Sequence, residues 1–258
     1  MFTQMQLQEQ IEAMGILPTD TLLIHSSMKA IGPVEGGADT VLDAFMDYMH
    51  RGLLVFPTHT WHQINDEYNV FDVLREPSCV GVLTNLFRLR PGVIRSWHPT
   101  HSVAAYGKDA AEFTQGEERF DTPCPRGGCY GKLYDRRAKI LFIGCDLSRN
   151  TTIHGVEEWS RIPNRIADTP QHLWIRTPEG KMLPRRLYRH YCTEGDVSAN
   201  YGKLEAPLLA RGIARKGRFG QAECTLVDVV PMVDLATSFL KKNPDLFIDG
   251  TPVPREWY

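Results

Sequence analysis

Three short apolar segments restrict the fold of this chain more than any other feature. They are residues 21–25 (TLLIH), 53–57 (LLVFP) and 139–144 (KILFIG), and polar residues follow each of them closely. Runs this short and this continuous predict strands buried on both faces, as in a parallel sheet covered by helices. A membrane span needs about 20 consecutive apolar residues, so we expect no transmembrane segment.

Apolar residues at helical spacing lie between and after these strands. We expect helices at residues 3–14, 38–50, 80–89, 151–160, 201–211 and 229–243, short strands at 93–96 and 103–106, and a long loop at 121–131. Residues 173–177 and 181–190 predict a hairpin, and residues 217–227 predict a second antiparallel pair. Early alternation of strands and helices, followed by hairpins, indicates an α/β fold with a mixed sheet and added C-terminal hairpins.

The length of the chain leaves two domain organisations open. With 258 residues, it suits one large domain or two small ones. The pattern changes near residue 165, which makes a boundary there the alternative, but no linker composition marks it. We therefore expect a single domain over residues 1–258.

The charge balance argues against nucleic acid as a partner. The chain has 29 basic and 31 acidic residues, and its net charge is −2. Nucleic-acid binders usually carry a basic excess, so we expect no nucleic-acid partner, and we expect no membrane partner either. The first ten residues lack the basic and apolar regions of a signal peptide. The six cysteines have no framework spacing, which indicates reduced thiols in a cytoplasmic protein.

Small polar residues directly follow the first strand. His25, Ser26 and Ser27 lead into a segment that contains Lys29 and Gly32. A strand that ends this way before a helix exposes backbone N–H groups, which suit a phosphate or a diphosphate. An ordinary strand-to-helix turn is the simpler interpretation. The GxxxxGK[ST] pattern of a nucleotide-binding P-loop is absent.

Two HxxH pairs raise the question of a metal. They are formed by His59 with His62 and by His98 with His101. Four histidines suit zinc, which keeps a metal-dependent hydrolase as an alternative function. However, both pairs lie in irregular segments, and no carboxylate or thiolate nearby completes a site. We therefore expect no metal, and interpret the second pair as part of a loop packed by Trp97.

A histidine and a carboxylate share one face of the helix expected at 151–160. His154 and Glu157 are three residues apart, so their side chains are neighbours. A carboxylate in this position orients an imidazole and stabilises its protonated form, which favours a general base. The site follows a buried strand, and open α/β sheets place their ligands beyond the carboxyl ends of strands. The alternative is an ordinary surface pair.

Cys124 and Cys129 are a further candidate for chemistry. Their spacing, CxxxxC, is not that of a redox CxxC motif. No neighbouring feature predicts the lowered thiol pKa that a cysteine nucleophile needs. We leave their role open.

Taken together, these motifs resemble one known family. In order, they are HSSMKAIGPVEGG at 25–37, FPTHT at 56–60, RSWHPTHSVAAYG at 95–107, FDTPCPRGGCYGKL at 120–133 and LFIGCDLSRNTTIHGVEE at 141–158. The chain is similar in this respect to the aminoglycoside 3-N-acetyltransferase family, over roughly residues 5 to 245. The resemblance implies a three-layer α/β fold, unlike that of the small N-acetyltransferases. It also implies acetyl transfer from acetyl-CoA to the 3-amino group of a 2-deoxystreptamine aminoglycoside, and hence antibiotic resistance.

The resemblance also implies roles for individual residues. His154 would take a proton from the attacking amine or from its ammonium form, and Glu157 would orient His154. The acetyl-CoA site would be formed by His25, Ser26, Ser27, Lys29, Gly32, His98, Thr100, His101 and Ser102. Since the acceptor would be a polycation, it requires local acidic or polar groups, for which the candidates are Asp66, Glu67, Asp72, Asn150 and Glu158. Thr152, Ser102 and backbone N–H groups are the candidates for stabilising the oxyanion.

The remaining expectations concern partners. The implied ligands are acetyl-CoA and an aminoglycoside, and the chain is expected to be a monomer or a homodimer. A coenzyme A-binding protein without aminoglycoside activity is the second alternative, beside the metal-dependent hydrolase.

Overall fold

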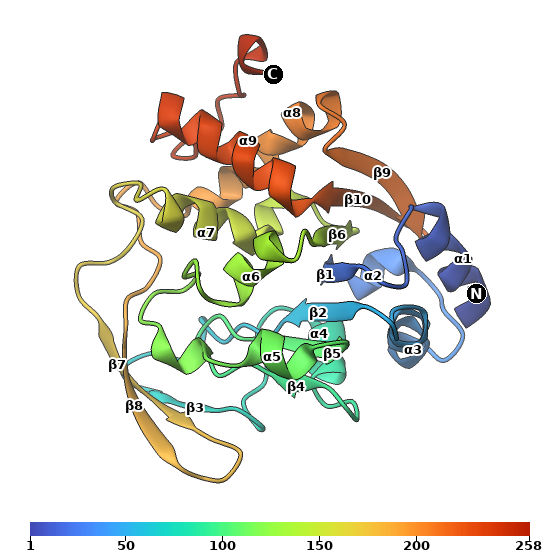
Figure 1. Cartoon of the computed structure of the whole chain (residues 1–258), viewed down its shortest axis with the longest axis horizontal. Helices are drawn as coiled ribbons and strands as arrows, with labels where there is room; N and C mark the ends of the chain where they lie inside the picture. The colour runs from blue at the N-terminus through green and yellow to red at the C-terminus, as the bar shows by residue number, and fades with distance from the viewer.

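A seven-stranded mixed sheet forms the centre of the molecule in the computed structural model, which describes all 258 residues (Figure 1). Its strand order is β4-β5-β2-β1-β6-β10-β9. The bounds are Ile94–Arg95 for β4, Val103–Gly107 for β5, Leu53–Pro57 for β2, Thr21–Ser26 for β1, Lys139–Ile143 for β6, Ala222–Asp228 for β10 and Ala214–Phe219 for β9. The three strands predicted from the apolar segments, β1, β2 and β6, lie side by side and parallel. All other neighbours pair antiparallel.

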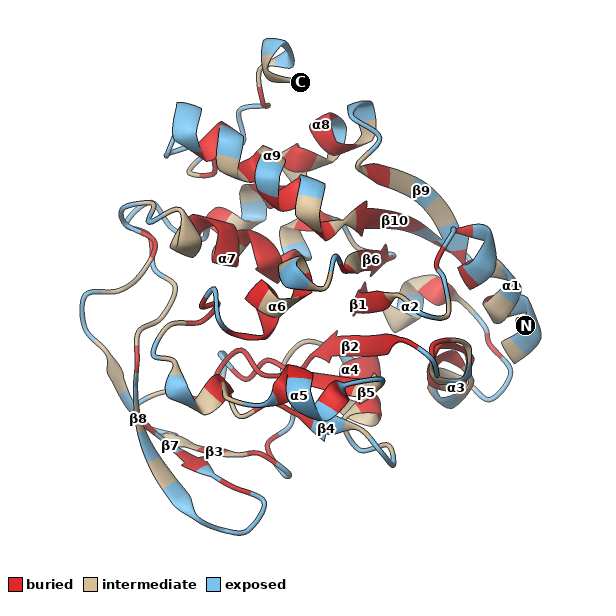
Figure 2. Cartoon of the chain, in the orientation of Figure 1, coloured by how far each residue is buried: buried red, intermediate tan, exposed pale blue.

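Helices cover both faces of this sheet, which gives the expected three layers. One face packs on α1 (Gln4–Ala13), α2 (Met28–Ile31), α3 (Ala38–Tyr48) and α4 (Val82–Phe87). The other packs on α5 (Ala110–Thr114), α6 (Cys129–Asp135), α7 (Thr151–Trp159), α8 (Glu205–Ala210) and α9 (Val229–Lys242). Successive strand residues point to opposite faces, so Leu22 and Leu23 belong to different cores. Figure 2 shows the strands at the centre of the sheet as buried.

A second, three-stranded sheet extends from one side of the molecule (lower left in Figure 1). It consists of β3 (Val70–Asp72), β7 (Gln171–Arg176) and β8 (Met182–Leu187), in the order β3-β7-β8. The predicted hairpin is therefore present, but it pairs with β3, a strand that the sequence patterns did not predict. A small core that includes Phe71, Leu173 and Ile175 lies beneath it.

Most predicted helices are confirmed, with two differences. Where we expected one helix at residues 201–211, the structure has a 3₁₀ helix at Val197–Leu204 followed by the short helix α8. The loop expected at 121–131 ends early, because α6 already begins at Cys129. Three other 3₁₀ turns lie at Glu117–Arg119, Leu147–Arg149 and Arg255–Trp257. The second predicted antiparallel pair joins the central sheet through β10, which pairs with β6 across the possible boundary near residue 165. The single domain over residues 1–258 stays a prediction.

No helix of the structure combines the length and the apolar character needed to cross a membrane.

The start of α6 depends on a glycine that has no room for a side chain. A Cβ atom at Gly131 would lie 1.7 Å from the carbonyl oxygen of Arg126. We expect Gly131→Ala to lower the free energy of unfolding by about 3 kcal/mol, because α6 or the preceding loop must move. Gly202→Ala is the control, since no atom lies within 4 Å of its added Cβ, and its change should stay below about 0.5 kcal/mol. Urea denaturation measures both, and equal stability of the two variants would contradict the prediction.

Candidate active site

A cavity of about 970 Å³ opens at the carboxyl ends of β1, β2 and β6. This edge of the sheet is where α/β proteins commonly bind their ligands. The residues after the strands line one side, and the first turn of α7 lines another. Residues 188–198, which we call the arm, contribute Arg189, His190, Tyr191, Cys192, Gly195, Asp196, Val197 and Ser198.

His154 reaches this cavity from the first turns of α7. The helix begins at Asn150, whose side chain accepts a hydrogen bond from the backbone N–H of Thr152 at 3.2 Å. This is the usual N-cap interaction. The His154 side chain is 17% exposed, so one part of the ring meets the cavity while the rest is packed. Burial lowers the pKa of His154 to about 4, and the charge of Asp196 opposes this effect. The imidazole is therefore neutral at pH 7.

The hydroxyl of Tyr201 connects His154 to Glu157. It lies 2.8 Å from His154 Nδ1 and donates its hydrogen to the Glu157 carboxylate. Because a tyrosine hydroxyl has only one hydrogen, its oxygen must accept the Nδ1–H of His154. The neutral ring then carries its lone pair on Nε2. Glu157 does not contact His154 directly, since the nearest oxygen is 3.9 Å from Nδ1.

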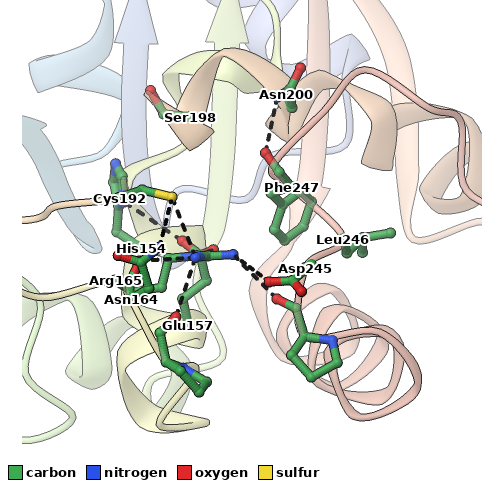
Figure 3. Close-up of polar contacts among 12 residues, drawn as sticks. His154, Glu157, Asn164, Arg165, Cys192, Ser198, Asn200, Asp245, Leu246 and Phe247 are labelled. Atoms are coloured by element: carbon green, nitrogen blue, oxygen red, sulfur yellow. Dashed lines mark hydrogen bonds and ion pairs between the residues drawn. The ribbon is translucent and has the colours of Figure 1, made fainter. Parts of the chain in front are cut away.

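Arg165 holds the other oxygen of Glu157 (Figure 3). Its Nε lies 2.6 Å from Glu157 Oε1, and both side chains are at most 3% exposed. The same guanidinium donates to the backbone carbonyls of Asn164 and Pro244. Burial raises the pKa of Glu157, whereas the hydrogen bonds from Tyr201 and Arg165 act in the opposite direction.

Five histidines lie next to one another beside the cavity. The rings of His154 and His190 stack with centroids 3.9 Å apart and an interplanar angle of 19°. His101 meets the edge of His190 at 5.1 Å, and His59 lies 4.8 Å from His101. His98 is 5.8 Å from His101. Burial lowers the pKa of every member, so the cluster is uncharged at neutral pH.

This cluster does not form a metal site. His98 Nδ1 accepts hydrogen bonds from the backbone N–H groups of Thr100 and His101, and its Nε2 lies 3.0 Å from the carbonyl oxygen of Thr122. Both ring nitrogens of His98 are thus occupied, and His62 is exposed. No group of three or more His, Cys, Asp or Glu residues is placed to hold a metal ion. The ligand set of the hydrolase alternative is therefore not assembled.

The structure brings about half of the predicted site residues to the cavity. Those that line it are His25, Ser26, Ser27, Thr100, His101, Asn150 and His154. Lys29 and Gly32 lie beyond the cavity wall in and after α2. Ser102 is fully buried and donates to the carbonyl of Thr58, while its oxygen accepts from Arg95. With His98 it supports the wall instead of forming it.

The predicted acceptor-side carboxylates have other contacts. Asp66 accepts from the backbone N–H of His172, and Asp72 accepts from those of Leu74 and Arg75. Glu67 is exposed. Glu158 accepts from the Thr122 hydroxyl and the Cys124 N–H. None of the four lines the cavity, where the carboxylates are those of Asp146 and Asp196.

Cys124 and Cys129 lie in the core and not in the cavity. Both are buried, and burial raises the pKa of each thiol well above its ordinary value. Neither has the lowered pKa expected of a nucleophile.

Sequence patterns missed three residues that surround His154. Tyr201, Arg165 and His190 come from segments after α7, and each meets His154 or Glu157 in space. The only sequence pattern that involves one of them is the predicted helix at 201–211, which does not indicate where the Tyr201 hydroxyl points.

The comparisons with known proteins agree with this architecture. A family model described as aminoglycoside 3-N-acetyltransferase matches residues 23–241. The chain is 28% identical to aminoglycoside N(3)-acetyltransferase VII of Streptomyces paromomycinus, covering 93% of this chain and 92% of that protein. It is 29% identical to aminoglycoside N(3)-acetyltransferase III of Acinetobacter baumannii, covering 94% and 93%. The solved structure of AAC-IIIb in a binary complex with CoASH superposes with a TM-score of 0.83 at 25% identity, covering 98% of this chain and 99% of that one.

The fold and the site therefore define a three-layer α/β protein with a neutral histidine at the carboxyl ends of its parallel strands. The chain belongs to the aminoglycoside 3-N-acetyltransferase family, as the sequence motifs predicted.

The buried ion pair beneath the site yields a stability prediction. Arg165→Met should lower the free energy of unfolding by about 3–5 kcal/mol, because it leaves the Glu157 carboxylate buried without its cation. Arg119→Met is the control, since Arg119 is 76% exposed and 3.8 Å from Glu118, and exposed pairs contribute about 0–1 kcal/mol. Chemical denaturation measures both. A loss at Arg165 no larger than that at Arg119 would show that Glu157 does not depend on its partner.

Proposed function

We propose that this chain transfers an acetyl group from acetyl-CoA to the 3-amino group of a 2-deoxystreptamine aminoglycoside and thereby confers resistance. The observation that carries the proposal is the state of His154. Its Nε2 lone pair is free, its ring is part of the cavity wall, and its Nδ1 is connected through Tyr201 to Glu157. This is the arrangement that a general base requires.

The proposed reaction is a direct transfer. The neutral amine nitrogen attacks the thioester carbonyl carbon, and its N–H becomes strongly acidic as the new bond forms. A base with the low pKa of His154 accepts the proton at this stage more readily than from the free ammonium. The tetrahedral intermediate then collapses, the C–S bond breaks, and the thiolate of coenzyme A takes the proton from His154. Meanwhile, Tyr201 and the Glu157 charge behind it stabilise the imidazolium.

We place the coenzyme along the strand-end side of the cavity. Ser26, Ser27 and Arg149 line this side. Arg149 lines the same cavity as His25 and Ser26 at the end of β1, and its charge adds to burial in lowering the pKa of His25 to about 3. A guanidinium suits the phosphate oxygens of coenzyme A. Of the predicted oxyanion donors, Ser102 is already occupied, whereas the buried Thr152 hydroxyl has no partner. Thr152 is, however, fully buried and does not line the cavity, so we propose that backbone N–H groups of the cavity wall, the third predicted candidate, stabilise the oxyanion.

We place the acceptor on the side of the arm. Asp196 lines the cavity there, and its charge acts on His154. Trp61 and Tyr191, which are 40% and 51% exposed, provide aromatic surface near it. A carboxylate beside aromatic faces suits a ligand with several ammonium groups. We also propose a cytoplasmic location, because all six cysteines are free and acetyl-CoA is an intracellular metabolite.

Replacement of His154 tests the function. His154→Ala should lower kcat by about 10³-fold, since it removes the general base, while the Kd for acetyl-CoA stays within about threefold. The assay follows thiol release from acetyl-CoA with a panel of aminoglycosides, and NMR of the product locates the acetyl group. His50→Ala, at an exposed histidine outside the cavity, is the control. Full turnover of His154→Ala would refute the base. Coenzyme binding without thiol release for any amine would favour the alternative of a binding protein.

The bridge between His154 and Glu157 can be tested separately. Tyr201→Phe removes the only hydroxyl between them, so the Nδ1–H loses its acceptor and the Glu157 charge no longer acts through it. We expect kcat to fall about 10- to 100-fold, less than on removal of the base, with little change in the KM for acetyl-CoA. Tyr134→Phe is a matched control that removes a hydroxyl bonded to Asp234 on the surface. Equal kcat values for the two variants would mean that the bridge has no part in turnover.

A further inference from the structure

His190 lies in the cavity wall and takes no part in the proposed proton transfer. Its ring stacks on that of His154 at 3.9 Å and 19°, close to parallel. The ring of His101 lies 5.1 Å from the His190 ring, at an interplanar angle of 86°. Its Nε2 is 3.8 Å from the Cys124 sulfur. The imidazole of His190 is thus fixed from several directions, and it presents a flat face to His154.

The backbone holds this ring in place together with Arg165. His190 forms an antiparallel bridge with Ile166. Next to it, Tyr191 N–H donates to the Arg165 carbonyl at 3.1 Å, and Ala167 N–H donates to the Arg189 carbonyl at 3.0 Å. The same short ladder therefore places Arg165 against Glu157 and His190 against His154. The two supports of the catalytic histidine are one structural unit.

His190 is not itself a free base. One side of its ring faces the Cys124 thiol, and a hydrogen bond with the backbone of Arg165 opposes the lowering of its pKa. Its nitrogens are therefore engaged, and what remains for His154 is the ring face. A stacked aromatic face fixes the plane of its neighbour and displaces water from one side.

We propose that His190 is a positioning residue for the acetyl transfer: its ring fixes the plane of His154 and keeps water from one face of the catalytic imidazole. This inference rests on the proposed function of His154. It predicts that the face of the His190 ring matters and that its nitrogens do not.

Other titratable and charged groups around His154 and His190 also affect the pKa of these rings, and they are the same in every His190 variant. The titratable and charged groups that face His190 or His154 are His59, His98, His101, Cys124, Glu157, Arg165, Asp196 and Tyr201. None of them changes in a substitution at His190, so a difference between variants reports the His190 ring itself.

A pair of variants tests the proposal. His190→Phe keeps a flat ring, whereas His190→Ala opens one face of His154 to water. NMR titration of the His154 ring should give a pKa in His190→Ala about one unit above that of the wild type, because burial is the main cause of its low value. In His190→Phe, the pKa should stay within about 0.3 units. The same experiment needs no turnover, so it separates this inference from the proposed function.

Kinetics give the second measurement. Because protonated His154 is not a base, the acidic limb of kcat/KM should move to higher pH in His190→Ala by the shift that NMR reports. The titration of the acceptor amine is common to all variants. We expect kcat to fall about tenfold in His190→Ala and less than threefold in His190→Phe, with the KM for acetyl-CoA within twofold in both.

Two results would overturn the proposal. One is a His190→Ala variant in which both the pKa of His154 and kcat equal those of the wild type. The other is a loss in His190→Phe as large as in His190→Ala, which would assign the effect to the imidazole nitrogens. Thermal unfolding followed by circular dichroism checks that each variant folds, and His190→Val replaces His190→Ala if alanine abolishes the transition.

Discussion

The carboxylate of Glu157 is the group on which the arrangement of the site depends. It is buried beneath the cavity, and a buried charge is tolerated only when it is paired and hydrogen-bonded. Arg165 and Tyr201 meet this requirement, and they bring two further segments against α7. Arg165 also contacts the carbonyl of Pro244 just after α9. One negative charge thus determines how four parts of the chain meet around His154.

Burial raises the pKa of Glu157 but lowers the pKa of the clustered histidines. Uncharged imidazoles cost much less to bury than a carboxylate, so several of them pack together without counter-ions, and their pKa values fall. The effect keeps His154 neutral in the free enzyme, and the Tyr201 bridge determines which nitrogen carries its proton. In the proposed reaction, the negative charge of Glu157 acts only later, when the imidazole accepts a proton. In the proposed reaction, His154 is thus a weak base that accepts a proton from the amine only after the new C–N bond has made the amine N–H strongly acidic.

The sequence predicted those parts of the structure that are local. The short apolar segments gave β1, β2 and β6, and the polar residues after them form the strand-end wall of the cavity. The position of His154 after β6 was also evident. By contrast, the contacts of Tyr201 and His190 depend on segments whose patterns are weak, a 3₁₀ helix and an isolated bridge. The carboxylates around residues 66–72 were assigned to the acceptor by charge alone. In the structure, Asp72 accepts from the N–H groups of Leu74 and Arg75 in its own turn, as aspartates commonly do. Asp66 accepts from the N–H of His172 in β7.

The origin of the arm has a consequence for how this enzyme can diversify. The cavity wall that we propose for the coenzyme belongs to the turns of the central sheet, whereas the wall proposed for the acceptor continues from the hairpin of the second sheet. Insertions or exchanges in residues 188–198 would therefore reshape acceptor selectivity while leaving the sheet intact. Yet the same segment carries His190, which stacks on the ring of His154, the proposed base. Acquiring a new acceptor by this route would be coupled to a change in the acidity range over which the enzyme works, so the two traits would evolve together.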